Sequence, residues 1–531
     1  MALLATFGGP DYVVVAAYFG LMIFIGHFVA RRKTDAEGYF LAQRSMPSWA
    51  VALSTVATAL SVATFTGAPQ QAFTGDLTYL SLNLGGFLAI FVVAFVFIPR
   101  FYRAGTVTIY GYIDQRFGET SRIAVSVTFL IGRLLASGAR LFIAGIPVCL
   151  LLYGSVKPDK AQLIKAILIV GVVGIAYTVA GGIRAVIWTD SMQICIVMGT
   201  LLLSIFLLLH KIPLSLGQIV DVLHQPTAAT GASKLRLFDL SIDPSHVNTL
   251  WTALIGGTYM GLASYGVDHD MAQRMLTAKS PLRASLSLIA AQCIGVVVVA
   301  TFLIAGLLLW IFYKRPDIMG ANAPTDPLGD STQVYPQFLL NHLSPGLVGL
   351  AMAGMFAAAQ GSLDSAINAM ASSAVSDIYW PIRRRMGLPV NTKTTQSRLA
   401  VLGMGLLLIL FAIWSAFRYD VKTDTVLVFA LGVMSFAYSG MLGVFLTALF
   451  TKRGNGTTVI AALIVGILVT AVLQKSVYPV WTEKLFGKPH ELAEFWWLPI
   501  GATISFLVCV AGPPAKTRVE AAVQVAVAER E

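Results

Sequence analysis

The sequence predicts an all-α polytopic membrane protein of about 13 transmembrane helices, built around two inverted repeats of five helices. Three observations support this prediction. Of the 531 residues, 56% are hydrophobic and only 12% are charged, whereas soluble domains average about 25% charged residues. Apolar runs long enough to cross a membrane recur along the whole chain. Two of these runs, five apart in order, contain glycine or proline near their middle.

The apolar runs form a single transmembrane domain, predicted over residues 1–512 and followed by a short cytoplasmic tail at 513–531. A helix needs roughly 20 apolar residues to span the bilayer, and each run approaches or exceeds that length. The runs lie near residues 11–31, 48–68, 79–99, 124–152, 161–180, 185–209, 247–267, 284–312, 346–376, 397–416, 423–445, 456–474 and 493–512.

Two runs are predicted to be broken near mid-membrane. The second contains Gly67 and Pro69, and the seventh contains three glycines within residues 256–261. Interrupted segments at corresponding places in two halves are typical of inverted-repeat transporters, which predicts repeats over about 48–209 and 247–445. The alternative is that glycine and proline are simply commoner in membrane helices than in soluble ones.

The net charge of +11 is explained by the membrane rather than by nucleic acid. Cytoplasmic loops of membrane proteins carry an excess of Lys and Arg. The pattern therefore predicts a multi-pass protein of the plasma (inner) membrane, with its N-terminus outside and its C-terminus cytoplasmic. The basic clusters fall in alternate loops, at residues 31–33, 100–116, 274–283, 383–398, 452–453 and 516–518.

The ninth run carries polar side chains within its apolar sequence, at Gln360, Ser362, Asp364, Ser365 and Asn368. Polar and ionisable groups at membrane depth usually mark an ion or substrate path, and a buried carboxylate requires a cation or a proton. The alternative is a face of small residues that only lets two helices approach closely. Asp364 argues against that alternative.

Other classes of function lack sequence support. The chain has no nucleotide-binding loop for an ATPase, and its four cysteines and scattered histidines form no metal-site spacing. We therefore expect no enzyme activity, no organic cofactor, no zinc site, no nucleic acid and no obligatory protein partner. The expected partners are the lipid bilayer and a small-molecule solute.

Five sequence segments in order resemble the sodium/solute symporter family, which includes sodium-coupled glucose, proline and sialic acid transporters. They are 54–61 (STVATALS), 187–193 (IWTDSMQ), 270–274 (DMAQR), 357–368 (AAAQGSLDSAIN) and 376–379 (SDIY). The resemblance covers most of the chain. It implies a LeuT-type core with one helix before it and two or more after it. It also implies sodium-coupled import, by alternating access, of a small polar solute, with a carboxylate-bearing solute such as sialic acid or proline favoured.

The resemblance implies a main sodium site between the second and ninth runs. Its ligands would be the carbonyl groups of Ala57, Leu60 and Ala358 and the hydroxyl group of Ser362. The preceding position, usually serine in the family, is Gly361 here, so one hydroxyl ligand is missing. A carbonyl group or a water molecule could replace it.

A further sodium site in some members implies roles for Asp190, Asp364 and Ser365. Two neighbouring carboxylates cannot both stay ionised without a cation or a shared proton, so sodium is expected there and proton coupling is the alternative. Asp190 could instead cap a helix N-terminus.

The solute is expected beside the broken helices, near the midplane. Arg133 and Arg140 stand seven residues apart on one face of the fourth run, and either could hold a carboxylate in a bidentate pair. The alternative is that they pair with an acid such as Asp76, or extend to the interface. The other expected lining residues are Ser61, Thr64, Phe65, Asn83, Tyr259, Ser264, Tyr265, Ser435 and Tyr438.

Rival functions are a proton-coupled symporter, an ion channel or ion-conducting sensor, and an intramembrane enzyme. A channel would favour a repeated filter loop, which the sequence lacks, and an enzyme would need a metal set or an activated nucleophile. His269, beside Asp268 and Asp270, is expected at a cytoplasmic helix end.

Overall fold

The computed structural model describes residues 8–30, 35–153, 159–227, 231–324, 331–390, 393–418, 425–475 and 477–514, and its regular elements there are all helices. The α-helices are α1 (Gly9–Ala30), α2 (Ala36–Leu41), α3 (Ser48–Ala59), α4 (Val62–Thr74), α5 (Leu82–Val92), α6 (Ile98–Ala104), α7 (Tyr110–Phe117), α8 (Glu119–Tyr153), α9 (Lys160–Lys211), α10 (Leu216–His224), α11 (Gly257–Leu262), α12 (His269–Leu276), α13 (Pro281–Lys314), α14 (Pro316–Met319), α15 (Val334–His342), α16 (Leu347–Ser373), α17 (Trp380–Arg385), α18 (Thr394–Arg418), α19 (Thr425–Phe450), α20 (Gly456–Val472), α21 (Tyr478–Phe486) and α22 (Trp497–Val510). Short 3-10 or π-helical turns are η1 (Ala42–Arg44), η2 (Thr78–Ser81), η3 (Val93–Phe97), η4 (Thr252–Gly256), η5 (Ala263–Val267), η6 (Gly320–Asn322), η7 (Ser331–Gln333), η8 (Ala374–Tyr379) and η9 (Glu494–Trp496).

The helices match the predicted membrane spans. Among the described residues, seven helices are long and apolar enough to cross a membrane, and the bent pair α3–α4 makes an eighth. Three shorter apolar helices lie in α19, in α20 and in η9–α22. Helix α9 has 52 residues and is kinked at Gly182, whose positive φ of 58° favours glycine. It therefore contains two predicted runs, and within the described residues each of the other predicted runs overlaps one of these helices or η4–α11–η5.

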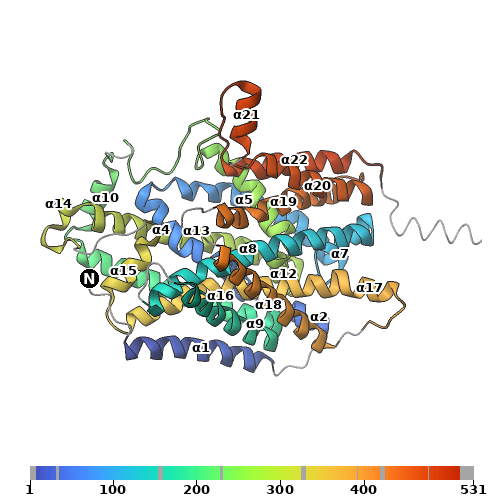
Figure 1. The fold of residues 1–531 in the computed structure, drawn as a ribbon, viewed down its shortest axis with the longest axis horizontal. Helices are drawn as coiled ribbons and strands as arrows, with labels where there is room; N and C mark the ends of the chain where they lie inside the picture. The colour runs from blue at the N-terminus through green and yellow to red at the C-terminus, as the bar shows by residue number, and fades with distance from the viewer. Residues whose placement is uncertain are drawn as a thin grey trace, which may run out of the picture.

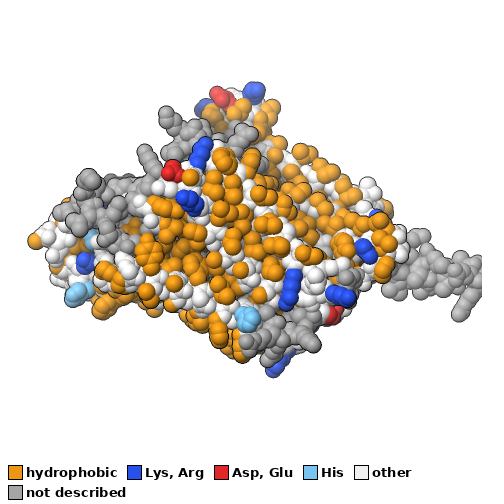
Figure 2. Space-filling view, turned by 60° about the horizontal axis from the view of Figure 1, so that its bottom comes forward, with side chains coloured by type: hydrophobic (Ala, Val, Ile, Leu, Met, Phe, Trp, Pro, Cys, Tyr) orange, Lys and Arg blue, Asp and Glu red, His pale blue; other side chains and the backbone are white. Residues whose placement is uncertain are grey.

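The outer surface suits a lipid environment. Figure 2 shows a face dominated by hydrophobic side chains, with the few charged side chains lying mainly near its borders. Large exposed apolar side chains include Phe24, Phe95, Phe206 and Leu468. Figure 1 shows α1 along one side of the bundle and α20 with α22 along the opposite side. Helix α1 packs on α9 and α16, whereas α20 and α22 pack on α19.

The break in the second span lies earlier than the sequence predicted. Helices α3 and α4 meet at an angle of 69°, and Leu60 and Ser61 between them are extended. The prediction of a break at Gly67 and Pro69 was wrong, because both residues lie inside α4. The backbone of Pro69 packs instead against Gly306 of α13, where a Cβ atom would come within 2.2 Å of the Pro69 carbonyl oxygen.

The predicted break in the seventh span was also misplaced. Residues 252–267 run as one helix with π-helical turns at both ends, and the interruption follows at Asp268, which is extended. The glycines serve close packing, since a Cβ atom on Gly257 would lie 2.8 Å from the Leu82 carbonyl oxygen and one on Gly261 2.5 Å from the Ala89 side chain. Small residues let membrane helices approach closely.

Two residues expected near the cytoplasmic surface, Arg274 and His269, are buried. The prediction that Arg274 belongs to a cytoplasmic loop was wrong, because the side chain is completely buried. His269 is equally buried and bonds Ser372, with 2.7 Å between Nε2 and Oγ. The basic residues 31–33 and residues 515–531 of the predicted tail lie outside the described residues.

Candidate functional site

A cavity of about 350 Å³ lies beside the break between α3 and α4. Its walls come from α3, η2, α5, α8, α11, η5, α12, α13, α19 and η9. A space of this size suits a small organic molecule. The lining residues are Thr58, Ala59, Tyr79, Leu82, Asn83, Gly86, Arg133, Arg140, Gly257, Met260, Gly261, Ser264, Tyr265, Asp268, Met271, Gln292, Val299, Tyr438 and Phe495.

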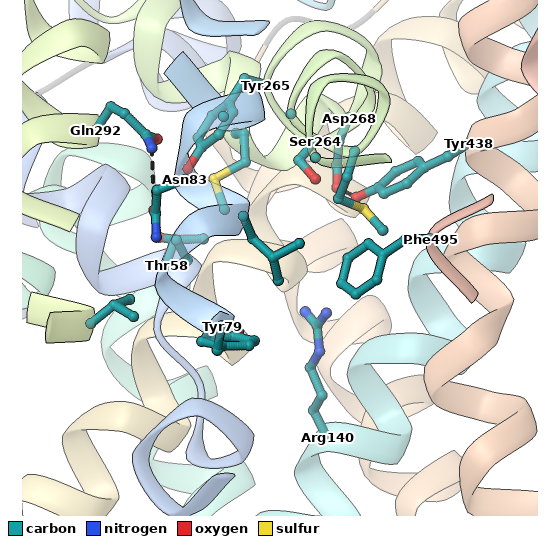
Figure 3. Close-up of a pocket in the computed structure, with 18 of the residues that line it drawn as sticks. Thr58, Tyr79, Asn83, Arg140, Ser264, Tyr265, Asp268, Gln292, Tyr438 and Phe495 are labelled. Carbon is teal, nitrogen blue, oxygen red and sulfur yellow. Dashed lines mark hydrogen bonds between the residues drawn. The ribbon is translucent and has the colours of Figure 1, made fainter. Parts of the chain in front are cut away.

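The two arginines of α8 differ in their partners. Arg133 is buried and its Nη2 lies 2.9 Å from Asp268 Oδ2, with a second ion pair to Asp270. Arg140 is half-buried and has neither a hydrogen bond nor an ion pair among the described residues. Figure 3 shows its side chain pointing into the cavity, in a view with Tyr79 and Phe495 on either side. The cavity therefore contains one guanidinium group whose five donors are unused.

The alternative that Arg133 pairs with an acid is confirmed, although the acid is not Asp76. The Asp76 carboxylate accepts hydrogen bonds from the backbone and hydroxyl groups of Thr78, at 3.0 and 2.6 Å. Asp268 also accepts a bond of 2.5 Å from the Tyr438 hydroxyl group. The positive charge of Arg133 is therefore already neutralised by Asp268 and Asp270 in the absence of a ligand.

The cavity brings together six of the predicted solute-binding residues and leaves out five. Phe65 packs in an aromatic cluster with Phe302 and Tyr335, and the Tyr259 hydroxyl lies 3.1 Å from the Thr503 hydroxyl. Ser61, Thr64 and Ser435 also lie outside the lining. Those that line it are Asn83, Arg133, Arg140, Ser264, Tyr265 and Tyr438.

Several lining groups were missed by the sequence reasoning. Gln292 of α13 donates a 3.4 Å bond to Asn83 Oδ1, as Figure 3 shows, and so adds a second amide to the wall. Thr58 was quoted only as part of a motif. The polar interruption of an apolar run was a usable signal for Gln292. None exists for Phe495, which only the fold brings to the cavity.

Arg274 is the centre of a buried polar cluster next to the cavity. Its Nη2 lies 3.0 Å from Asp190 Oδ2 and also donates to the Ser365 hydroxyl group, while its Nη1 lies 3.0 Å from Asp270 Oδ1. Its Nε donates a bond of 2.9 Å to the Ser54 hydroxyl, which in turn donates one of 2.5 Å to Asp190. All these side chains are buried.

The cluster changes the predicted Asp190–Asp364 pair. One guanidinium group now lies between Asp190 and Ser365, so that Asp190 is already neutralised by a cation of the chain. Asp364 is held separately, by a 2.5 Å bond from the Tyr177 hydroxyl and a 3.0 Å bond from the backbone of Ser365. The sequence signal for Arg274 was its spacing of four residues from Asp270, which pairs side chains on a helix.

Asp190 is not a helix cap. It lies within α9, eight residues after the kink at Gly182, where backbone N–H groups already have helical partners. One of its oxygen atoms, Oδ1, is buried and has no hydrogen-bond partner among the described residues.

The residues of the implied main sodium site lie where α3 ends against α16. A Cβ atom on Gly361 would lie 3.2 Å from the Ala57 carbonyl oxygen, so these two residues are in contact. Helix α3 ends at Ala59, and Leu60 is extended, which leaves the last carbonyl groups of α3 without helical donors. Ser362 donates to the Ala359 carbonyl at 3.2 Å. Thr58 and Ser365 link the same two helices through hydroxyl groups 3.1 Å apart.

Comparisons with known proteins show which proteins this chain resembles. The model of the sodium:solute symporter family matches residues 39–466. The chain is 27% identical over 466 residues to the sodium/sialic acid symporter SiaT of Proteus mirabilis, covering 87% of this chain and 89% of that protein. It is 27% identical over 485 residues to the human sodium/iodide cotransporter, covering 89% and 71%.

A solved structure of a Na⁺-coupled sialic acid symporter, in a substrate-bound outward-open state, aligns with a TM-score of 0.80. It is 24% identical in sequence, and the alignment covers 96% of this chain and 99% of that one. This likeness confirms the predicted all-α fold with a LeuT-type core. Because the family model spans most of the chain, the protein is a member of the sodium:solute symporter family.

Proposed function

We propose that the protein is a sodium-coupled symporter that imports a small organic anion, with a carboxylate as the group it recognises. Family membership supports sodium-coupled transport of a solute. The named substrates of the two relatives, sialic acid and iodide, are both anions at neutral pH. Of these, an organic acid uses the polar wall of the cavity better, because iodide offers no hydrogen-bond donors.

Arg140 is the observation that carries this proposal. An unpaired guanidinium group inside a membrane protein requires an anionic partner, and the cavity in front of it can hold a small molecule. A carboxylate matches the two parallel N–H donors of arginine. Asn83, Ser264, Tyr265 and Gln292 would then recognise the hydroxyl or amide groups of the solute.

The charge of the buried cluster supports a cation as the coupling ion. Within the described part of the chain, Asp190, Asp268 and Asp270 form ion pairs with two guanidinium groups, those of Arg133 and Arg274, and Asp364 forms none. We propose that Asp364 and the free Oδ1 of Asp190 contribute to one sodium site, in which Ser365 would join only by giving up its bond from Arg274. We propose that Ala57, Leu60, Ala358 and Ser362 form another. Hydroxyl and carbonyl oxygens suit a hard cation better than a proton relay.

The transport cycle follows from the fold. Solute and sodium bind beside the break in the second span, and rocking of the core helices opens the site to one side and then the other. Moving one charge across 100 mV releases about 2.3 kcal/mol. Two sodium ions with one monovalent anion carry one net positive charge, so the potential alone supports roughly 40- to 50-fold accumulation, and the sodium concentration gradient adds to it. We propose location in the inner membrane, with the N-terminus outside and the C-terminus in the cytoplasm.

Uptake into proteoliposomes tests this function. Labelled sialic acid, small monocarboxylates, iodide and uncharged glucose are offered under an inward sodium gradient, an inward proton gradient, or neither. We expect concentrative uptake of a carboxylate that requires the sodium gradient. Uptake driven by the proton gradient alone would identify a proton symporter, and flux that follows neither gradient would exclude symport. Uptake of iodide without any organic acid would exclude the carboxylate.

A further inference from the structure

Phe495 is a cavity wall residue that comes from beyond both predicted repeats. It belongs to η9, ahead of α22, whereas every other lining residue among those described falls between Thr58 and Tyr438. The second repeat is predicted to end near residue 445. A segment that follows the core therefore supplies an aromatic side chain to the candidate solute site.

The backbone of η9 is fixed against the seventh span. A Cβ atom on Gly256 would lie 2.7 Å from the Phe495 carbonyl oxygen and 2.8 Å from the Phe495 Cβ atom, so the two segments are in contact. The Ala493 N–H group donates a hydrogen bond of 2.9 Å to the Pro244 carbonyl group, and the Trp496 N–H group donates one of 3.0 Å to the Ala493 carbonyl group. The position of Phe495 is therefore held by its backbone and by that of its neighbours.

The ring of Phe495 is not used by the hydrophobic core. It is half-buried, whereas Trp497 and Leu498, which follow it, are buried. Within the described part of the chain, the ring neither belongs to the continuous core of buried apolar side chains nor packs against it. The ring does line the cavity. Its side chain therefore faces the space in which a solute would bind.

This ring lies near the group that is proposed to hold the solute. In the view of Figure 3 it stands between the Arg140 guanidinium group and the pair of Asp268 and Tyr438, and all four side chains line the same cavity. A carboxylate held by Arg140 would leave the rest of the solute to extend into a space of about 350 Å³. Aromatic side chains are rigid and have only two χ angles. The ring therefore restricts the space next to the bound carboxylate.

We propose that Phe495 is a specificity-determining residue, whose ring limits the bulk that a solute can carry beside the carboxylate held by Arg140. The inference rests on the proposed function. A hydrophobic wall discriminates between solutes that differ by one methylene group by roughly 10- to 200-fold. Such specificity depends on a clash with the wrong solute as well as on contact with the right one. The C-terminal segment that contains η9 and α22 thus takes part in solute selection.

The competing explanation is that Phe495 only fastens η9 to the seventh span. A substitution would then lower stability, or weaken the binding of every carboxylate to the same degree. A wall that limits size predicts instead a change in the ratio between the affinities for bulky and compact carboxylates. Arg140→Gln is the opposite case, because it removes the partner of the group that all carboxylates share. It should weaken every carboxylate and leave that ratio unchanged.

Thermal stabilisation of the purified full-length protein by carboxylates, at saturating sodium, measures the ratio. The probes are butyrate, hexanoate, benzoate and sialic acid. In Phe495→Ala, the affinities for benzoate and sialic acid relative to butyrate should rise by about tenfold or more, and in Phe495→Trp they should fall. Phe486→Ala is the matched control, since it removes the same ring from an exposed position at the end of α21. It should keep the wild-type ratio.

A third variant keeps the proposal testable if Phe495→Ala folds poorly. Phe495→Leu keeps an apolar wall of smaller size and should shift the ratio in the same direction as Phe495→Ala, but less. Wild-type ratios in both Phe495→Leu and Phe495→Trp would overturn the size-limiting role alone, and so would an equal weakening of all four probes. A wild-type protein that none of the carboxylates stabilises in sodium would contradict the proposed function together with this inference.

Discussion

Arg140 and Arg274 carry the same guanidinium group, but they differ in burial and in the partners that they bond. Arg274 is fully buried and bonded to Asp190, Asp270, Ser54 and Ser365. Arg140 lines a cavity of about 350 Å³ and has no bonded partner among the described residues. The charge of Arg274 is paired by carboxylates of the chain, whereas the charge of Arg140 is the one that the proposed function assigns to the solute carboxylate.

This difference separates a structural charge from a binding charge. A buried ion pair is weak evidence for stability, yet breaking one leaves an uncompensated charge. An unpaired arginine that borders a cavity has no bonded partner to lose, and in the proposed function the solute carboxylate supplies that partner. The two sites therefore predict opposite results for the same type of substitution.

The largest effect is expected at Arg274. In Arg274→Met the carboxylates of Asp190 and Asp270 lose their shared partner, and we expect a loss of about 3–5 kcal/mol in the free energy of unfolding. The measurement is the yield of monodisperse protein and its melting temperature in detergent. Arg103→Gln, at an exposed end of α6, is the matched control. An Arg274→Met protein as stable as wild type would remove the distinction between the two arginines.

Arg140→Gln should instead lower solute affinity without lowering the stability of the protein. The solute carboxylate would lose its charge-assisted bonds, worth about 1.5–3 kcal/mol, so solute affinity should fall by roughly 10- to 150-fold. The melting temperature without solute should equal or exceed that of wild type, because no native bond is lost. Binding is measured by titration calorimetry. A less stable Arg140→Gln protein with normal solute affinity would identify Arg140 as structural.

Asp364→Asn tests the carboxylate that Arg274 does not bond. The amide keeps the hydrogen bond from Tyr177 but removes the negative charge, so sodium affinity should fall by about tenfold while expression stays intact. Sodium-dependent thermal stabilisation checks this expectation. The same sodium dependence in the variant and in wild type would exclude Asp364 from the ion site.

The smallest effect on solute affinity is expected at Tyr265, with Tyr259 of the same helical stretch as its control. Tyr265 lines the cavity, whereas the Tyr259 hydroxyl bonds Thr503 outside it. Tyr265→Phe should lower solute affinity by about two- to tenfold, the value of one neutral hydrogen bond, and Tyr259→Phe should leave it unchanged. Equal losses in both variants would show that the binding region extends beyond the described cavity.

Much of the fold was predictable because each membrane span can be recognised in the local sequence. Each span is a run of apolar residues whose length is set by the bilayer, independent of its neighbours. The ninth run was recognisable for the same reason, since the polar residues Asp364 and Ser365 interrupt its apolar sequence. The family resemblance added the LeuT-type core, which the family model and the solved structure then supported.

The positions of the breaks were not predictable, because glycine and proline have several uses in a helix. Gly67 and Pro69 were chosen for their backbone properties, yet α3 ends at Ala59, and neither Ala59 nor the extended Leu60 after it is a helix-breaking residue type. On either side of the bend, α3 packs chiefly against α9 and α13, and α4 packs chiefly against α13. In the seventh span the glycines provide close contact with α5, and the interruption falls at Asp268.

The sequence by itself therefore determined the class of protein and the positions of its apolar runs, and it drew attention to the polar ninth run, to which the proposed sodium sites belong. Only the tertiary structure decided which charges are paired. The sequence does not show which of Arg133, Arg140 and Arg274 is paired. Helix packing brings carboxylates to Arg133 and Arg274, whereas Arg140 faces a cavity. The physical reason is that hydrophobicity is a property of a local segment, whereas charge neutralisation depends on distances between segments far apart in the chain.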